Sequence, residues 1–315
     1  MALPSDMKFD VLRAPDSIYD TLPAGVFQAD KRVQSRRTCS GCQMTPEGSE
    51  SGARMVCSRC KSAWYCSQEC QRKDWRTHKE HCISQEGTHI AKFLERLQRT
   101  PYLSSLLQVA IALCLDIPSG RVSPARPYLV GLPVGFEPDI ETLLNMRQGT
   151  PLPKGTQGFF QINGILYDEN ITPSPARTEM WKKGKEQLAR KGFEDAFIVV
   201  LEFRNRDEGL ATSSIIHIMS PSIEIARKKE DFETKSALTG DVVKRPMNVG
   251  TTLEAFNTTL RHDTQNKFKM RKIMSDADIG LLQQAIDGEV GTSPFAIAEK
   301  WKRERVYQVQ KVKTQ

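Results

Sequence analysis

Hydrophobic residues follow two kinds of spacing from about residue 88 onward. Ile90, Phe93, Leu94 and Leu97 recur at the three- and four-residue spacing of an amphipathic helix. A second apolar helix is expected from Pro101 to about residue 115. Short runs rich in Ile, Val and Phe predict strands instead. The strand candidates are residues 128–132, 159–167, 196–203 and 213–219.

Helices are expected between and after these strands. The helix candidates are residues 139–147, 176–191, 250–262, 276–287 and 293–309. Ser293 followed by Pro294 suits the start of the last helix, with an N-cap and a proline in its first turn. Strands mixed with helices predict a domain with a real core, of the α+β or α/β type. We take α+β as the fold class.

The N-terminal part of the chain has a different composition. Residues 1–38 carry three prolines and end in a basic stretch, so we expect an N-terminal extension there. A cysteine-rich segment, 39–82, follows and is expected to be a small domain. Residues 88–315 are expected to form the C-terminal α+β domain, whose function the sequence leaves unknown.

Length and charge agree with this division. A chain of 315 residues suggests about two domains. The formal net charge of +7 is only moderately basic and does not by itself indicate nucleic-acid binding. The longest apolar stretch, 106–115, is about half as long as a membrane span, and the N-terminus lacks a secretory pattern. We therefore expect an intracellular protein, in the nucleus or cytoplasm, with no membrane partner.

Seven of the eight cysteines lie between Cys39 and Cys82, and with one histidine they form four pairs. The pairs are Cys39-x2-Cys42, Cys57-x2-Cys60, Cys66-x3-Cys70 and His78-x3-Cys82. Two residues between cysteines allow a tight turn that brings both sulfurs to one ion, and three place both ligands on one helical face. Eight ligands predict two closed, tetrahedral Zn²⁺ sites with a structural role.

The expected helix within this segment decides how the pairs are shared. Residues 67–82 contain neither proline nor glycine and predict a helix with Ser67 as the candidate N-cap. Cys66 and Cys82 would then lie about 24 Å apart at 1.5 Å per residue, too far for one ion. The sites are therefore expected to interleave, with the first and third pairs on one ion and the second and fourth on the other.

The same segment resembles a known family. Its pattern is Tyr65-Cys66-Ser67-x2-Cys70-Gln71-x3-Trp75-x2-His78-Lys79-x2-Cys82, with the earlier cysteine pairs in place. It is similar to the MYND zinc finger, and the whole chain resembles fungal-type MYND finger proteins without a SET domain. The resemblance implies a cross-brace: Cys39, Cys42, Cys66 and Cys70 on one zinc, and Cys57, Cys60, His78 and Cys82 on the other.

The resemblance also implies an interaction site on the finger. In the family, residues equivalent to Gln71 and Trp75 help to form a groove for proline-containing peptides. An aromatic face beside an amide suits an extended peptide that loses little entropy on binding. The alternative hypothesis is that Trp75 fills the small core of the finger and that Gln71 is merely solvated. The expected function is a protein-interaction module with an adaptor or regulatory role.

Nucleic-acid binding is a weaker hypothesis. Residues 31–85 hold 11 Lys and Arg against five acids, a formal charge of +6. Two Zn²⁺ ions and seven thiolates reduce this to about +3, because the ligand thiols bind deprotonated. The segment matches neither a Cys2His2 finger nor a recognition helix for the major groove.

Enzymatic activity is also disfavoured. MYND fingers occur inserted in SET methyltransferases, which carry a glycine-rich cofactor segment before the finger and an Asn-His-Ser-Cys segment after it. This chain has neither. We therefore expect a non-enzyme with no catalytic residues, and keep as the alternative an enzyme with an unidentified active site in residues 120–290.

Overall fold

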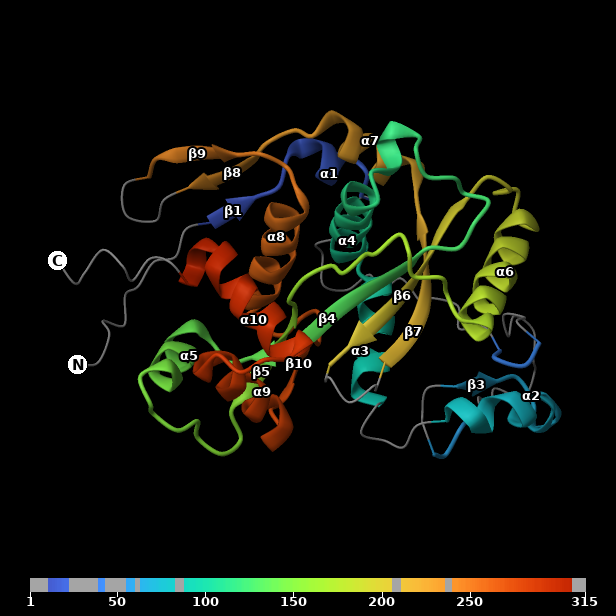
Figure 1. Cartoon of the computed structure of the whole chain (residues 1–315), viewed down its shortest axis with the longest axis horizontal. Helices are drawn as coiled ribbons and strands as arrows, with labels where there is room; N and C mark the ends of the chain where they lie inside the picture. The colour runs from blue at the N-terminus through green and yellow to red at the C-terminus, as the bar shows by residue number, and fades with distance from the viewer. Residues whose placement is uncertain are drawn as a thin grey trace. The chain divides into compact units, whose positions relative to one another are not determined.

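The computed structural model describes residues 11–22, 39–42, 55–59, 63–82, 88–205, 211–235 and 240–307 (Figure 1). Contacts divide the chain into two compact units. The larger unit consists of residues 1–24 and 101–315, and the smaller of residues 25–100. Helices and strands are mixed, with the finger preceding the larger domain, so the α+β fold class is confirmed.

A five-stranded sheet forms the centre of the larger unit. Its order is β10 (Arg271–Ile273), β5 (Gln157–Ile162), β4 (Leu129–Glu137), β6 (Phe197–Arg204) and β7 (Ala211–Ile218). β4 and β6 run parallel, and the other neighbours are antiparallel. β4 and β6 are buried along almost their whole length, which identifies them as the central strands.

Helices cover both faces of this sheet. α6 (Pro175–Ala189) packs Trp181 against Ile198 and Val200 on one face. Successive strand residues point to opposite faces, so Val199 and Leu201, which are also buried, point the other way. α4 (Pro101–Cys114) lies on that other side (Figure 1). α4 is buried on nearly all sides, as expected for a core helix.

Further helices follow the central strands of the larger unit or precede them. They are α5 (Ile140–Arg147), α7 (Ser220–Lys228), α8 (Val249–His262), α9 (Asp276–Asp287), α10 (Thr292–Arg303), η2 (Ile117–Ser119) and η3 (Arg305–Tyr307). Side-chain caps fix several starts: Asn248 caps α8, and Ser275 and Asp278 form a capping box on α9. All five helices expected after residue 139 are present, but α7 was not predicted. The expected N-cap of the last helix is wrong, because α10 begins at Thr292 and is capped by Gly291.

A second, three-stranded sheet in the larger unit joins distant parts of the chain. Its order is β1 (Val11–Arg13), β8 (Phe232–Lys235) and β9 (Val242–Arg245), all antiparallel. α1 (Asp16–Asp20) follows β1 and buries Ile18, and Tyr19 stacks on Tyr102 with ring centroids 5.5 Å apart. This part of residues 1–38, where we expected an extension, therefore packs into the larger unit.

Among its described residues, the smaller unit has one short ladder and two helices. β2 (Met55–Val56) and β3 (Trp64–Tyr65) form a two-residue antiparallel ladder, followed by α2 (Gln68–His81) and α3 (Thr88–Arg99). Within the finger segment, residues 39–82, the buried cluster of described residues is small: Cys39, Cys57, Ala63, Tyr65 and Cys82. Three of these five residues are cysteines, so this segment has few apolar contacts to stabilise it.

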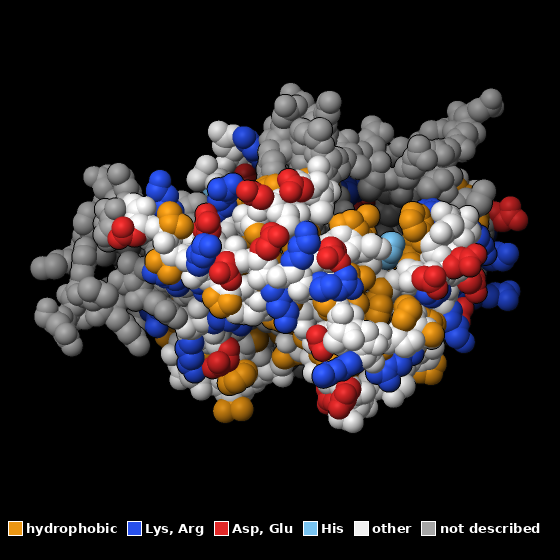
Figure 2. All heavy atoms as spheres, turned by 90° about the horizontal axis from the view of Figure 1, so that it is seen from above, with side chains coloured by type: hydrophobic (Ala, Val, Ile, Leu, Met, Phe, Trp, Pro, Cys, Tyr) orange, Lys and Arg blue, Asp and Glu red, His pale blue; other side chains and the backbone are white. Residues whose placement is uncertain are grey.

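No helix among the described residues is both long and apolar enough to cross a membrane. On the face of the molecule shown in Figure 2, acidic and basic side chains of the described residues are interspersed. That face therefore shows no continuous basic patch of described residues of the kind that binds a phosphate backbone.

Candidate metal centre

Helix α2 carries ligand candidates at both of its ends. Ser67 is its N-cap, and the Ser67 hydroxyl accepts a hydrogen bond from the Cys70 backbone N–H at 3.1 Å, as predicted. Cys66 and Cys70 lie at the start of the helix, and His78 and Cys82 lie at its end. One helix therefore presents two pairs to two different places.

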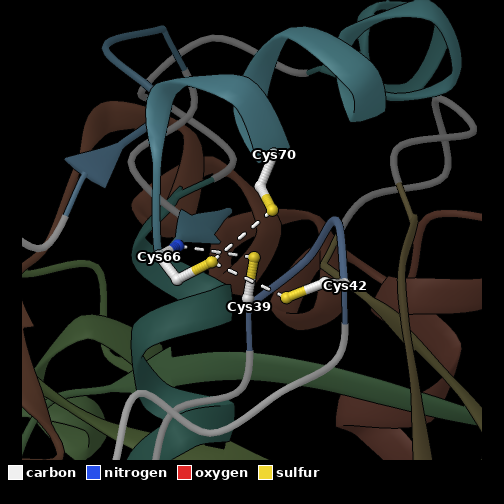
Figure 3. A group of neighbouring side chains, drawn as sticks. All are labelled: Cys39, Cys42, Cys66 and Cys70. Carbon is white, nitrogen blue, oxygen red and sulfur yellow. Dashed lines mark hydrogen bonds between the residues drawn. The ribbon is translucent and has the colours of Figure 1, made fainter. Parts of the chain in front are cut away.

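Four sulfurs converge at the start of α2 (Figure 3). The ligand atoms of Cys39, Cys42, Cys66 and Cys70 all lie within 4.8 Å of one another. Cys66 Sγ lies 3.6 Å from Cys42 Sγ and 3.5 Å from Cys70 Sγ. A tetrahedron with Zn–S bonds of about 2.3 Å has S···S edges of roughly 3.8 Å, whereas a disulfide bond is about 2.05 Å long. The observed spacing therefore fits four ligands around one ion.

The backbone around this group is close-packed. The Cys66 N–H donates to Cys39 Sγ at 3.4 Å, a contact typical of a thiolate ligand. A Cβ atom added at Gly41 would lie 2.8 Å from the Cys70 carbonyl oxygen. Only glycine allows the turn between Cys39 and Cys42 to approach the first turn of α2 this closely.

The thiols of this group do not ionise independently. Burial raises the pKa of Cys39, but backbone N–H groups of Cys42, Cys66 and Gly41 bring it down to about 6. The neighbouring side chains of Cys70, Cys39 and Cys42 raise the pKa of Cys66 to about 12. Several thiolates so close together repel one another, and a bound dication removes that repulsion. The donor set therefore suits a cation such as Zn²⁺.

A second group forms at the other end of α2. The ligand atoms of Cys57, His78 and Cys82 lie within 4.8 Å of one another, and Cys57 Sγ is 3.7 Å from Cys82 Sγ. Tyr65 meets the His78 ring edge-on at 6.4 Å and helps to orient it. Cys60, the expected fourth ligand, lies outside the described residues. The pairing of first with third and second with fourth is thus the grouping that the described side chains adopt.

Gln71 and Trp75, the expected peptide-binding residues, lie on the same face of α2, one turn apart. The Trp75 side chain is exposed, with 41% of its surface accessible, and Gln71 is half-buried. The Trp75 ring lies 5.8 Å from the His78 ring. The alternative hypothesis required Trp75 to fill the finger core. Its ring is instead accessible to a partner.

Comparisons with known proteins assign both parts of the chain. A model of the MYND finger matches residues 39–82. A second family model, described as a domain of unknown function (DUF8205), matches residues 85–307, which is more than half of the chain. The chain belongs to the DUF8205 family. The prediction of a MYND finger is confirmed, and with it zinc binding and a module for protein interaction.

A curated protein is similar to a short part of this DUF8205 protein. N-lysine methyltransferase SMYD2 from Gallus gallus is 46% identical over 46 residues. That match covers 15% of this chain and 9% of the methyltransferase. No solved structure matches the chain.

A buried network of charged residues lies within the DUF8205 region, and the sequence did not point to it. Lys300 and Glu304 are fully buried, and Glu137 is 2% exposed. Lys300 forms an ion pair with Glu137, while an Arg261 guanidinium nitrogen lies 2.8 Å from Glu304 Oε2 and 3.6 Å from Glu137 Oε2. Two carboxylates and two cations balance one another.

Hydrogen bonds satisfy much of what remains of this network. Trp301 Nε1 donates to Glu137 Oε1 at 2.9 Å, and the Tyr307 hydroxyl donates to Glu137 Oε2. Asn257 Nδ2 donates to Glu304 Oε1 at 2.7 Å. Burial raises the pKa of Glu137, but the charges of Lys300 and Arg261 lower it below its usual value. We interpret this enclosed network as an anchor for α10 and η3.

One signal in the sequence could have identified Lys300. Ala296, Ile297 and Trp301 recur at the spacing of a buried helical face, and Lys300 belongs to the same face. A lysine at such a position is almost never buried without a partner. The pattern therefore indicates a buried acid, but it does not say which one.

Proposed function

We propose that this chain is an adaptor or regulatory protein whose finger binds a proline-containing peptide through Gln71 and Trp75. The finger holds two Zn²⁺ ions through Cys39, Cys42, Cys57, Cys60, Cys66, Cys70, His78 and Cys82. The observation that carries the proposal is the exposed ring of Trp75 on α2, the helix that also bears ligand candidates of both groups.

The metal ions and the peptide site are coupled through α2. Zn²⁺ bound at both ends of the helix fixes its direction and therefore the orientation of Trp75 and Gln71. An indole offers a large contact area with few rotatable bonds, and the Gln71 amide can bond a peptide carbonyl. A proline-containing segment is already extended, so it loses little entropy on binding.

We propose a non-enzymatic role for the chain. The likeness to the methyltransferase is restricted to 46 residues in the finger, so its reaction does not carry over. Each zinc site would be closed by four protein ligands, with no position left for a substrate or a reactive water. An intracellular location, nuclear or cytoplasmic, fits thiolate ligands that must stay reduced.

We also propose the boundaries of the parts. Residues 39–82 form the finger and residues 88–315 the C-terminal domain, preceded by residues 1–38. The match of the MYND model to 39–82 supports the first boundary pair. The match of the DUF8205 model from residue 85 supports the second.

The test combines metal analysis with peptide binding by the full chain. Inductively coupled plasma mass spectrometry should find two zinc ions per chain, and one in a Cys66→Ala variant that loses the first site. Trp75→Ala and Gln71→Ala should retain two ions yet bind a proline-containing peptide at least about tenfold more weakly. Lys73→Ala, on the opposite side of α2, is the matched control. Unchanged binding by Trp75→Ala would overturn the peptide site.

A further inference from the structure

The exposed face of α2 around Trp75 is asymmetric in charge. Gln68, Arg72, Trp75 and Lys79 follow one another at four-, three- and four-residue steps, so they form one continuous stripe along the helix. All four side chains are exposed. Gln71 and His78 flank the other side of Trp75 and are half-buried toward the metal groups. Two cations therefore lie beside Trp75 on its solvent side, and the neutral amide of Gln71 lies on its other side.

No carboxylate of a described side chain on α2 neutralises this stripe. At 100° per residue, Glu69 and Asp74 project about 100° or more away from Trp75 around the helix. Glu69 lies one turn before Arg72, but no ion pair joins these two described side chains. Asp74 is also engaged elsewhere, since its Oδ2 accepts the Tyr65 hydroxyl at 2.8 Å. Within the described part of the chain, neither Arg72 nor Lys79 has an ion-pair partner. Both cations are available to a ligand.

We propose that the peptide bound at Trp75 carries acidic residues on one side of its proline, where they meet Arg72 and Lys79. This inference rests on the proposed function of the finger and specifies its partner. The two cations are one turn from Trp75 in either direction, so a peptide crossing the ring passes within reach of both. The opposite flank of the peptide contacts the neutral Gln71, so charged residues there should add no affinity.

Charge complementarity at an exposed rim acts mainly on selectivity and association rate. The expected gain is therefore modest, roughly three- to tenfold in affinity at low ionic strength for two exposed pairs. It should shrink as salt is added, because exposed charges are screened over about 10 Å at 0.1 M salt. Contact with the indole, in contrast, should hardly depend on salt.

The experiment uses the full zinc-loaded chain and dodecamer peptides with the same two central prolines. One series places three glutamates before the prolines, one places them after, and two more carry glutamine or lysine at both ends. Fluorescence anisotropy at low and at physiological salt gives the affinities. One glutamate peptide should bind three- to tenfold more tightly than the glutamine peptide, and the lysine peptide more weakly.

Single charge reversals then locate the effect. Arg72→Glu and Lys79→Glu should each remove most of the preference for glutamate, and the double variant should prefer the lysine peptide. Lys73→Glu makes the same change of charge on the far side of α2 and should retain the preference. Zinc content measured for each variant excludes loss of the fold.

The outcomes separate this inference from the proposed function. Equal affinity for the glutamine and glutamate peptides, with binding still lost in Trp75→Ala, would overturn the acidic partner and leave the peptide site standing. An equal loss of preference in Lys73→Glu would also overturn it, because the effect would then reflect net charge alone. Failure of every peptide to bind would overturn both proposals.

Discussion

The two compact units of this chain are stabilised internally in different ways. The larger unit buries a five-stranded sheet between helices and encloses a neutral set of ion pairs within that core. In the finger, which belongs to the smaller unit, the described ladder has two residues per strand, and the buried cluster is mostly cysteine. A unit of this size cannot offset its conformational entropy by burial alone, so metal binding has to supply the folding free energy.

The difference also separates stability from recognition. In the larger unit the described charged residues at the centre are paired and enclosed, which anchors the C-terminal helix. In the finger, Arg72 and Lys79 of α2 face solvent beside an exposed indole. Polar groups that stabilise a fold are buried with partners, whereas those that bind another molecule stay accessible.

Metal removal should have the largest effect, because it should unfold one unit and not the other. A chelator should unfold residues 39–82 completely and leave the larger unit folded, because only the finger depends on ligand bonds. Hydrogen exchange read by mass spectrometry should show α2 losing all protection while β4 and β6 keep theirs. Loss of protection in both units together would show that they form one cooperative core.

The second largest effect should be confined to the larger unit and leave the finger unchanged. Lys300→Ala leaves Glu137 buried without its closest cation, and it should lower the free energy of unfolding of the larger unit by about 3–5 kcal/mol. Zinc content should not change. Lys302→Ala, two residues away with a side chain 74% exposed, is the matched control and should shift stability by less than about 0.5 kcal/mol. Equal effects of the two variants would show that the network adds no stability.

Acid should weaken the larger unit through the same network. The pKa of Glu137 is lowered in the folded state by Lys300 and Arg261, against the effect of burial. A lowered folded pKa means that this carboxylate stabilises the fold above its ordinary pKa of 4.5, and that the contribution disappears as pH falls below it. Urea unfolding between pH 7 and pH 3 should show the loss. In Glu137→Gln that part of the pH dependence should be absent.

Trp75→Ala should have only a small effect on the stability of the finger. Because the ring is 41% exposed, its removal should lower the free energy of unfolding of the finger by no more than about 1 kcal/mol. The same change should weaken peptide binding. Calorimetry of the zinc-loaded chain and the anisotropy assay together check this prediction. A large loss of stability would mean that Trp75 is a core residue after all.

Hydrophobic patterns along the sequence predict helices and strands correctly where the elements are long and buried in the core of the larger unit. The apolar runs at 196–203 and 213–219 correspond to β6 and β7 with shifts of one or two residues. The strands of the second sheet were missed, because β1, β8 and β9 are three or four residues long and β9 exposes Val242 and Val243. Such strands exist through pairing with distant partners, and their own composition carries little signal.

The spacing of the metal ligands, the helix between Cys66 and Cys82 and the family of the finger can all be predicted from the amino-acid sequence. These depend on neighbours along the chain, within one or two helical turns. Three other features require the folded chain: β1 pairs with β8, Trp301 and Lys300 contact Glu137 more than 160 residues away, and the Trp75 ring is exposed. Contacts of that range depend on how the elements pack, and a local pattern cannot encode which partner they find.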